Sequence, residues 1–195
     1  MAVESTQQIA PAGVERWRFT VDDFYRMGEV GILPPEARVE LIDGEVIKMA
    51  PIGSGHSGSV EYLGHRLRQG VGDAAFVRTQ NPIRLGLRLE PEPDLSVVRP
   101  RADFYRRSHP APADVFLVVE VADSTLTYDR DTKGPRYTQA GIIEYWIVDL
   151  ANDRLVVHRG PVDGVYQDVR ILTREDTVQP LAFPELTIAV TDILG

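Results

Sequence analysis

The sequence predicts an α/β fold in which a mixed β-sheet is flanked by helices, and three observations lead to this prediction. The run from Val115 to Val121 is apolar except for Glu120, which is typical of a central strand covered on both faces. Residues 56–71 carry apolar side chains at helical spacing, and strand-like segments stand before and after them. With 195 residues, of which 43% are hydrophobic, the chain is long enough for one compact domain.

The first half of the chain is predicted to hold a helix, a hairpin and then the helix of residues 56–71. Residues 1–16 are small and polar and are expected to form a flexible arm, which leaves 17–195 as a single domain. Thr20 is a suitable cap for a helix, with an acidic residue three positions later. Asp43 and Gly44 lie between two strand-like segments, 38–42 and 45–49, and predict a hairpin.

Short strands are then expected, followed by a second helix. The pattern predicts strands at 75–79 and 83–87, a strand that begins at Asp94, and the buried strand that contains Glu120. Because proline is tolerated only in the first turn, Pro135 predicts a helix that begins no earlier than about residue 131 and runs to about 140, after a polar loop over 124–130. The remaining strands are expected at 144–149, 155–158, 165–172 and near 188.

Composition excludes several functional classes. The absence of cysteine rules out disulfides, thiolate zinc sites and cysteine nucleophiles. A net charge of -8 argues against broad nonspecific adhesion to nucleic acid, although a local arginine patch is compatible with it. No stretch approaches the roughly 20 apolar residues that span a bilayer, and the start of the chain lacks signal-peptide character, so a cytoplasmic protein with no membrane contact is expected.

Glu120 is the residue most informative about function, because an unpaired carboxylate in a buried strand costs several kcal/mol. A divalent cation, a lysine or a raised pKa would compensate it. Asp94 opens another strand after Pro93, and two carboxylates are ligands that magnesium commonly uses, with the Val121 carbonyl as a third oxygen. The alternative is that Asp94 ends a proline turn and Glu120 pairs with a basic side chain.

Lys133 is expected at the N-terminal end of the predicted second helix. A cation there opposes the helix macrodipole by roughly 0.3 to 1 kcal/mol, which indicates a functional residue. Beside two metal-binding acids it would orient the attacking water or offset charge that develops on phosphorus. The alternative is an exposed lysine paired with Asp129 at i,i+4.

An ordered series of motifs carries a family resemblance. Its members are Glu40 to Glu45, His56, Pro93-Asp94, Glu120-Val121 with Ser124, Asp129, Lys133, Tyr137, and Glu144 to Asp149. Over about residues 17–190 the chain resembles the Uma-two-type restriction endonucleases of the PD-(D/E)XK nuclease superfamily. The resemblance implies a restriction-endonuclease-like α/β core, DNA as the substrate, and Asp94 and Glu120 as ligands of Mg2+ (or Mn2+).

The chain departs from the superfamily pattern at one position. The general motif places lysine two residues after the second acid, where this sequence has Ala122. In the family a lysine on the following helix takes its place, which maps to Lys133. Glu40 lies where the N-terminal acid of the superfamily is expected and is either an outer metal ligand or a hairpin-edge acid. His56 either contacts phosphate and transfers protons or is a capping or packed histidine.

The sequence therefore predicts a Mg2+- or Mn2+-dependent DNA endonuclease with Asp94, Glu120, Lys133 and Glu40 as its catalytic residues. A second reading is an inactive nuclease-like module that binds nucleic acid or a protein, which the acidic charge and Ala122 favour. A third is an assembly protein in which Glu120 is only ion-paired. Because restriction-like nucleases often cut both strands as dimers, a homodimer is expected, although no dimerisation helix is visible.

Overall fold

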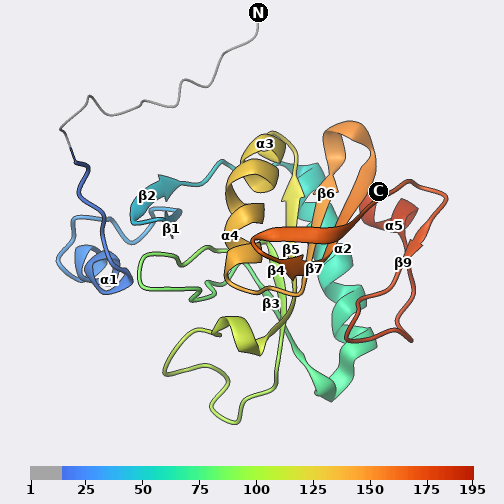
Figure 1. Ribbon diagram of the computed structural model, residues 1–195, viewed down its shortest axis with the longest axis horizontal. Helices are drawn as coiled ribbons and strands as arrows, with labels where there is room; N and C mark the ends of the chain where they lie inside the picture. The colour runs from blue at the N-terminus through green and yellow to red at the C-terminus, as the bar shows by residue number, and fades with distance from the viewer. Residues whose placement is uncertain (1–14) are drawn as a thin grey trace, which may run out of the picture.

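The computed structural model describes residues 15–195, so residues 1–14 of the predicted N-terminal arm lie outside the described part of the chain (Figure 1). The α-helices are α1 (Val21–Glu29), α2 (Ser54–Val71), α3 (Leu126–Tyr128), α4 (Gly134–Gln139) and α5 (Val190–Leu194). Thr20 caps α1 as predicted, because its side chain accepts from the Asp23 backbone while the Asp23 carboxylate accepts from the Thr20 backbone. Within residues 15–195, no helix combines the length and the apolar character needed to cross a membrane.

A six-stranded mixed sheet forms the centre of the molecule, with strand order β3-β4-β5-β6-β7-β8. Its strands are β3 (Phe76–Thr79), β4 (Leu95–Val98), β5 (Val115–Ala122), β6 (Glu144–Asp149), β7 (Arg154–Val162) and β8 (Val165–Leu172). All neighbouring pairs are antiparallel except β5 and β6, which are parallel. A parallel pair requires a crossover, which the helical segment between these two strands supplies. The predicted mixed sheet is confirmed.

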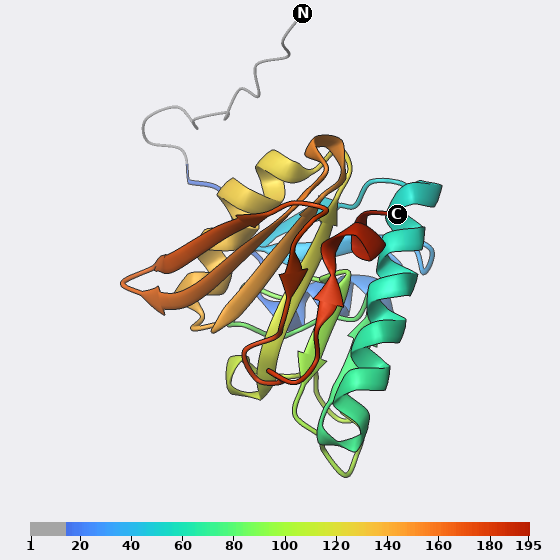
Figure 2. The same ribbon diagram turned by 90° about the vertical axis from the view of Figure 1, so that its right-hand side faces the viewer.

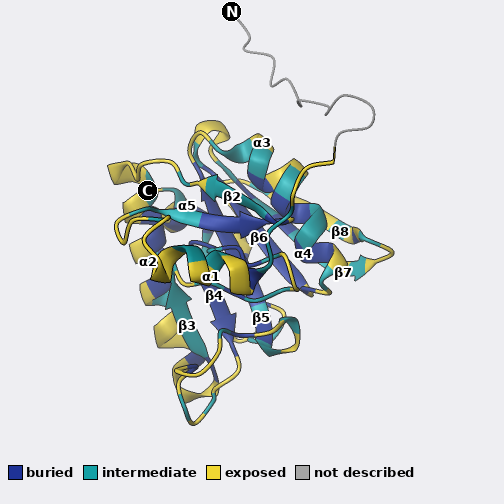
Figure 3. Cartoon of the chain, turned by 90° about the vertical axis from the view of Figure 1, so that its left-hand side faces the viewer, coloured by how far each residue is buried: buried dark blue, intermediate teal, exposed yellow. Residues whose placement is uncertain are grey.

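Helices cover both faces of the sheet (Figure 2). On one face, Leu63 and Leu67 of α2 pack in a buried cluster with Val119 of β5, and Ile193 of α5 joins them. On the other face, the buried cluster contains Val118 of β5 and Tyr137 of α4. Alternate residues of β5 thus enter different cores, which explains why its sequence is a continuous apolar run. Figure 3 shows the same pattern as a buried central sheet with exposed loops.

The predicted hairpin is formed by β1 (Val39–Ile42) and β2 (Glu45–Lys48). Its turn residues, Asp43 and Gly44, have φ angles of 51° and 76°, as a two-residue hairpin turn requires. A side chain at Gly44 would come within 2.8 Å of the Phe19 carbonyl oxygen, so glycine is needed there for space as well. A bridge between Leu41 and Glu90 ties the hairpin to the loop before β4, and this contact positions Glu40.

Two sequence-based assignments are wrong. Residues 83–87 form a loop instead of a strand, with one isolated β-bridge between Gly86 and Leu89. The backbone N–H groups of Ile83 and Arg84 donate to the carbonyls of Pro91 and Pro110, so they are not available to a neighbouring strand. The helix predicted to begin near residue 131 begins earlier, at α3, and continues through a π-helical turn, Asp129–Lys133, into α4.

The π-helical turn explains how a helix can precede Pro135. The Gly134 N–H donates to the Asp129 carbonyl five residues earlier, and this wider turn makes room for the proline at the start of α4. Lys133 consequently lies in the middle of a helical segment. The unfavourable interaction with the macrodipole that was expected at a helix N-terminus therefore does not arise. The C-terminal part of the chain adds β9 (Thr177–Val178) and β10 (Ile188–Ala189), which form a separate two-stranded sheet.

Candidate active site

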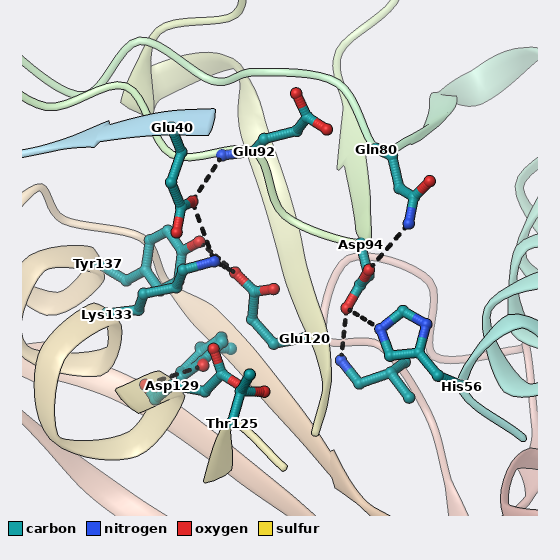
Figure 4. A network of polar contacts seen from close by, with 12 residues as sticks. Glu40, His56, Gln80, Glu92, Asp94, Glu120, Thr125, Asp129, Lys133 and Tyr137 are labelled. Atoms are coloured by element: carbon teal, nitrogen blue, oxygen red, sulfur yellow. Dashed lines mark hydrogen bonds and ion pairs between the residues drawn. The ribbon is translucent and has the colours of Figure 1, made fainter. Parts of the chain in front are cut away.

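Two acids from neighbouring strands face one pocket. Leu95 pairs with Val119, and this register places Asp94, the residue before β4, opposite Glu120 of β5 and on the same face of the sheet. Both residues line a pocket of about 280 Å³. Figure 4 shows both carboxylates among the same group of polar side chains. The two acids therefore lie on one side of the sheet.

Lys133 is buried between two carboxylates. Its side chain is 6% exposed, and Nζ lies 3.1 Å from Oε1 of Glu120 and 3.1 Å from Oε2 of Glu40. Glu40 Oε2 also accepts from the backbone N–H of Glu92 at 3.2 Å (Figure 4). Hairpin, central strand and π-helical turn thus bring these three candidate residues together. The alternative of an exposed lysine paired with Asp129 is wrong.

The charges of this cluster are unequal, because several acids surround one ammonium group. Burial would lower the pKa of Lys133, but the charges of Glu120, Glu40 and Asp129 outweigh it and raise that pKa, so the lysine stays cationic. Burial raises the pKa of Glu120 well above its ordinary value. The charge of Lys133 lowers this pKa in part, and the charges of Asp129, Asp94 and Glu40 raise it. The site holds excess negative potential, which a bound cation would relieve.

Tyr137 contacts the same carboxylate from helix α4. Its hydroxyl donates to Glu120 Oε1 at 2.6 Å, and the side chain is 1% exposed. It is therefore both a core residue of the second cluster and a hydrogen-bond partner of the site. Trp146 lies in the opposite core and does not line the pocket.

Asp94 is held by three donors. Oδ2 accepts from the backbone N–H of Val121 at 2.9 Å and lies 3.1 Å from Nε2 of His56, while the Gln80 amide reaches Oδ1 at 3.3 Å. Burial would raise the pKa of Asp94, but the hydrogen bond and charge of His56, together with the bonds from Val121 and Gln80, lower it. Asp94 is accordingly ionised at neutral pH.

His56 lies in the first turn of α2, as the sequence predicted, and lines the pocket. Its hydrogen bond to Asp94 raises its pKa, against the opposing effect of burial. Its Nδ1 atom is buried without a hydrogen-bond partner in the described part of the chain. The histidine is thus neither a helix cap nor a purely packed residue.

The donor set fits a small divalent cation that keeps part of its water shell. Among residues 15–195, no three histidine, aspartate or glutamate side chains are arranged to hold a metal together. Magnesium, however, is commonly held by one or two carboxylates and several waters. In a β-strand the N–H and C=O of one residue point to the same side, so the Val121 carbonyl faces the side on which its N–H meets Asp94. Asp94, Glu120 and this carbonyl suit magnesium or manganese.

Ala122 occupies the position in β5 where the superfamily motif has its lysine. The residue is fully buried in the second core, on the same face as Glu120. Lys133 reaches Glu120 from the helical segment instead.

Three further residues belong to the site and were not identified from the sequence. Gln80 bonds Asp94 from a turn with a φ of 48°, and no sequence pattern marks it. The Tyr128 hydroxyl is buried in the pocket wall without a described partner. Thr125 donates to Asp129 at 2.6 Å, and the i,i+4 spacing of these two residues is a signal that could have revealed their contact.

Comparisons with known proteins bear on the family and the fold of this chain. Residues 21–191 match the model of the Uma2 family, described as "Putative restriction endonuclease". Among solved structures, the chain is similar to a "putative nuclease belonging to DUF820" from Anabaena variabilis ATCC 29413, with a TM-score of 0.70 and 19% identity. The alignment covers 90% of this chain and 97% of that one, and at this identity it shows the fold alone. Comparison with curated proteins finds no match. Because the family match spans nearly the whole chain, the protein belongs to the Uma2 family of nuclease-like proteins.

Proposed function

We propose that the protein is a Mg2+- or Mn2+-dependent endonuclease that hydrolyses DNA phosphodiester bonds, with Asp94, Glu120 and Lys133 as its catalytic residues and Glu40 as their partner. One observation carries the proposal. Lys133 brings a buried cation to within 3.1 Å of Glu120 from a different backbone position than the missing motif lysine would use. Membership of a family described as restriction endonucleases supplies the reaction class.

Asp94, Glu120 and the carbonyl of Val121 would hold the metal. When bound there, Mg2+ or Mn2+ would polarise a phosphoryl oxygen and lower the pKa of a bound water. The pKa of Asp94 is lowered, and its hydrogen bonds to His56 and Val121 fix the orientation of the carboxylate in the pocket. Tyr137 fixes the second carboxylate by its bond to Glu120.

Lys133 acts as a fixed positive charge and hydrogen-bond donor rather than as a base. Its raised pKa keeps it protonated across the physiological range. An ammonium aimed into a desolvated pocket stabilises the negative charge that develops on a phosphate under attack. Glu40, anchored by the Glu92 N–H, holds the ammonium beside Glu120 and so positions it for this role.

The test is metal-dependent cutting of plasmid DNA by wild type and Asp94→Asn, with Asp73→Asn as a matched control at an exposed position. We expect cutting in Mg2+ or Mn2+ that EDTA abolishes, and a loss of about two to three powers of ten in Asp94→Asn only, the range seen when one transition-state contact is removed. Equal cutting by all three proteins would reveal a contaminating nuclease and contradict the proposal.

Two other functions are alternatives to the nuclease, and a metal titration distinguishes them from it. An inactive nuclease-like module is favoured by the net charge of -8 and by Ala122, and it would bind DNA or a protein without cutting. An assembly protein with an ion-paired Glu120 also accounts for the 3.1 Å contact of Lys133. Calorimetric titration of Mg2+ and Mn2+ into wild type and Asp94→Asn separates these readings, because only the nuclease requires metal binding that depends on Asp94.

A further inference from the structure

Strand β8 is an open edge of the central sheet. It pairs with β7 on one side, and within residues 15–195 no other strand pairs with its second side. The opposite edge strand, β3, has four residues, whereas β8 has eight. Figure 3 shows β7 and β8 projecting from the body of the molecule. A long exposed edge presents a row of backbone donors and acceptors to a partner strand.

Strand β8 exposes apolar side chains to solvent. Val169 is 52% exposed and Ile171 is 59% exposed, and they stand two residues apart on one face. Between and beside them lie Asp168 and Arg170, which form an exposed ion pair with each other at 2.9 Å. Edge strands of natural proteins usually carry charges that prevent pairing with a second copy. The signs and positions of Asp168 and Arg170 therefore decide whether β8 repels or attracts another β8.

The charge pattern of β8 is complementary to itself in one register. Two copies of β8 can pair antiparallel about a twofold axis perpendicular to the sheet. Residues that lie opposite each other must then point to the same face of the joined sheet. This holds only if the axis passes through a residue position and not between two residues. An axis at Asp168 places two aspartates opposite each other, and an axis at Arg170 places two arginines opposite each other. An axis at Val169 instead sets each Asp168 opposite an Arg170 and the two valines against one another.

We propose that β8 binds β8 of a second copy of this chain, antiparallel and centred on Val169, so that the two central sheets join into one. The exposed apolar side chains become covered, and each Asp168 exchanges its partner two residues away for an arginine across the axis. This interface is independent of the nuclease assignment. It identifies the surface on which a homodimer would form.

A single introduced cysteine tests the register directly, because the protein has none of its own. In Val169→Cys the two thiols face each other across the axis, at about the 4.5 to 5.5 Å that separates Cβ atoms of opposite residues. We expect most of the protein to be crosslinked by a short bis-thiol reagent or by mild oxidation. Val162→Cys is the matched control, because Val162 is also 52% exposed but lies at the hairpin tip, on the order of 25 Å from its symmetry mate at about 3.4 Å per residue.

Charge reversal tests the same register in solution. Wild type should sediment at twice 21.7 kDa at micromolar concentration. Asp168→Arg alone and Arg170→Asp alone should each weaken the dimer at least tenfold, and the two changes combined should restore it. Thermal melting of each variant verifies the fold. A wild type that stays monomeric, equal crosslinking of both cysteine variants, or a double variant no better than the single ones would each overturn the proposal.

Discussion

Lys133 is buried between two carboxylates, and this burial makes its charge important for stability as well as for the proposed reaction. At the N-terminal end of a helix, where the sequence placed it, the lysine would contribute little to the free energy of unfolding. In the structure, its removal leaves Glu40 and Glu120 facing each other without a cation. Breaking a buried ion pair by deleting one partner costs roughly 3 to 5 kcal/mol.

Lys133→Ala should therefore lower the free energy of unfolding by about 3 kcal/mol or more and reduce cutting by at least about a hundredfold. Urea denaturation and the plasmid assay measure the two effects. Lys133→Arg should not restore cutting, because a planar guanidinium does not fit where a compact ammonium sits.

A second variant separates stability from catalysis. Combining Lys133→Ala with Glu40→Gln removes one of the unpaired acids, so we expect it to recover part of the lost stability and none of the cutting. Recovery of cutting would show that Lys133 serves the fold alone.

Individual residues differ in how far the sequence reveals them. Glu120 is identified by its apolar neighbours, and Asp94 by the proline before a strand. The contact between Glu40 and Lys133 is invisible to sequence reasoning, because it depends on how the hairpin leans over the sheet. Gln80 was missed because its role comes only from a turn that aims its amide at Asp94.

At the scale of elements, local patterns predicted best where one rule acted alone. The Asp43-Gly44 hairpin and strands β6 and β8 lie where the sequence placed them. Strand β7 runs beyond the predicted 155–158 because cross-strand pairing with β8 extends it. The start of the second helix was wrong because a π-helical turn relaxes the proline rule, and tertiary contacts such as Tyr145 Oη to the Asp129 carbonyl support that turn.

Strand β7 carries a histidine that should make stability depend on pH. Burial lowers the pKa of His158 below its ordinary 6.5, against a smaller opposing effect of its backbone bond to Tyr145. Below about pH 6.5, His158 is therefore protonated more readily in the unfolded chain than in the folded chain. As a result, the free energy of unfolding falls as pH falls.

His158→Phe should remove this contribution, which is at most about 1.4 kcal/mol per pH unit for one group. Urea denaturation between about pH 5 and 7.5 measures the stability difference between variant and wild type, and the difference should shift in favour of the variant as pH falls. His65→Gln, at an exposed position of α2, is the control for replacing a histidine. Parallel curves for wild type and His158→Phe would contradict the assignment.

At the scale of the whole molecule, the sheet order explains why the site lies where it does. The crossover between parallel strands β5 and β6 carries Lys133, and the hairpin inserted before α2 carries Glu40, so residues far apart in sequence meet at the end of β5. The apolar β5 run and the helix-strand alternation were sufficient to predict a mixed sheet with helices on it. Strand order was not predictable from them, because it depends on which buried faces pack together.

Metal binding at the end of β5 should stabilise the whole fold. A ligand that binds only the folded chain adds about 2.7 kcal/mol at a hundred times its dissociation constant. For a chain of this size, each kcal/mol raises the melting temperature by roughly 2 to 4 °C, so Mg2+ or Mn2+ at saturation should raise it by about 5 to 10 °C. Because Glu120 has a raised pKa and must be ionised to bind a cation, the shift should shrink as pH falls. Asp94→Asn should abolish the shift and Asp73→Asn should retain it, whereas an equal shift in both variants would place the metal elsewhere.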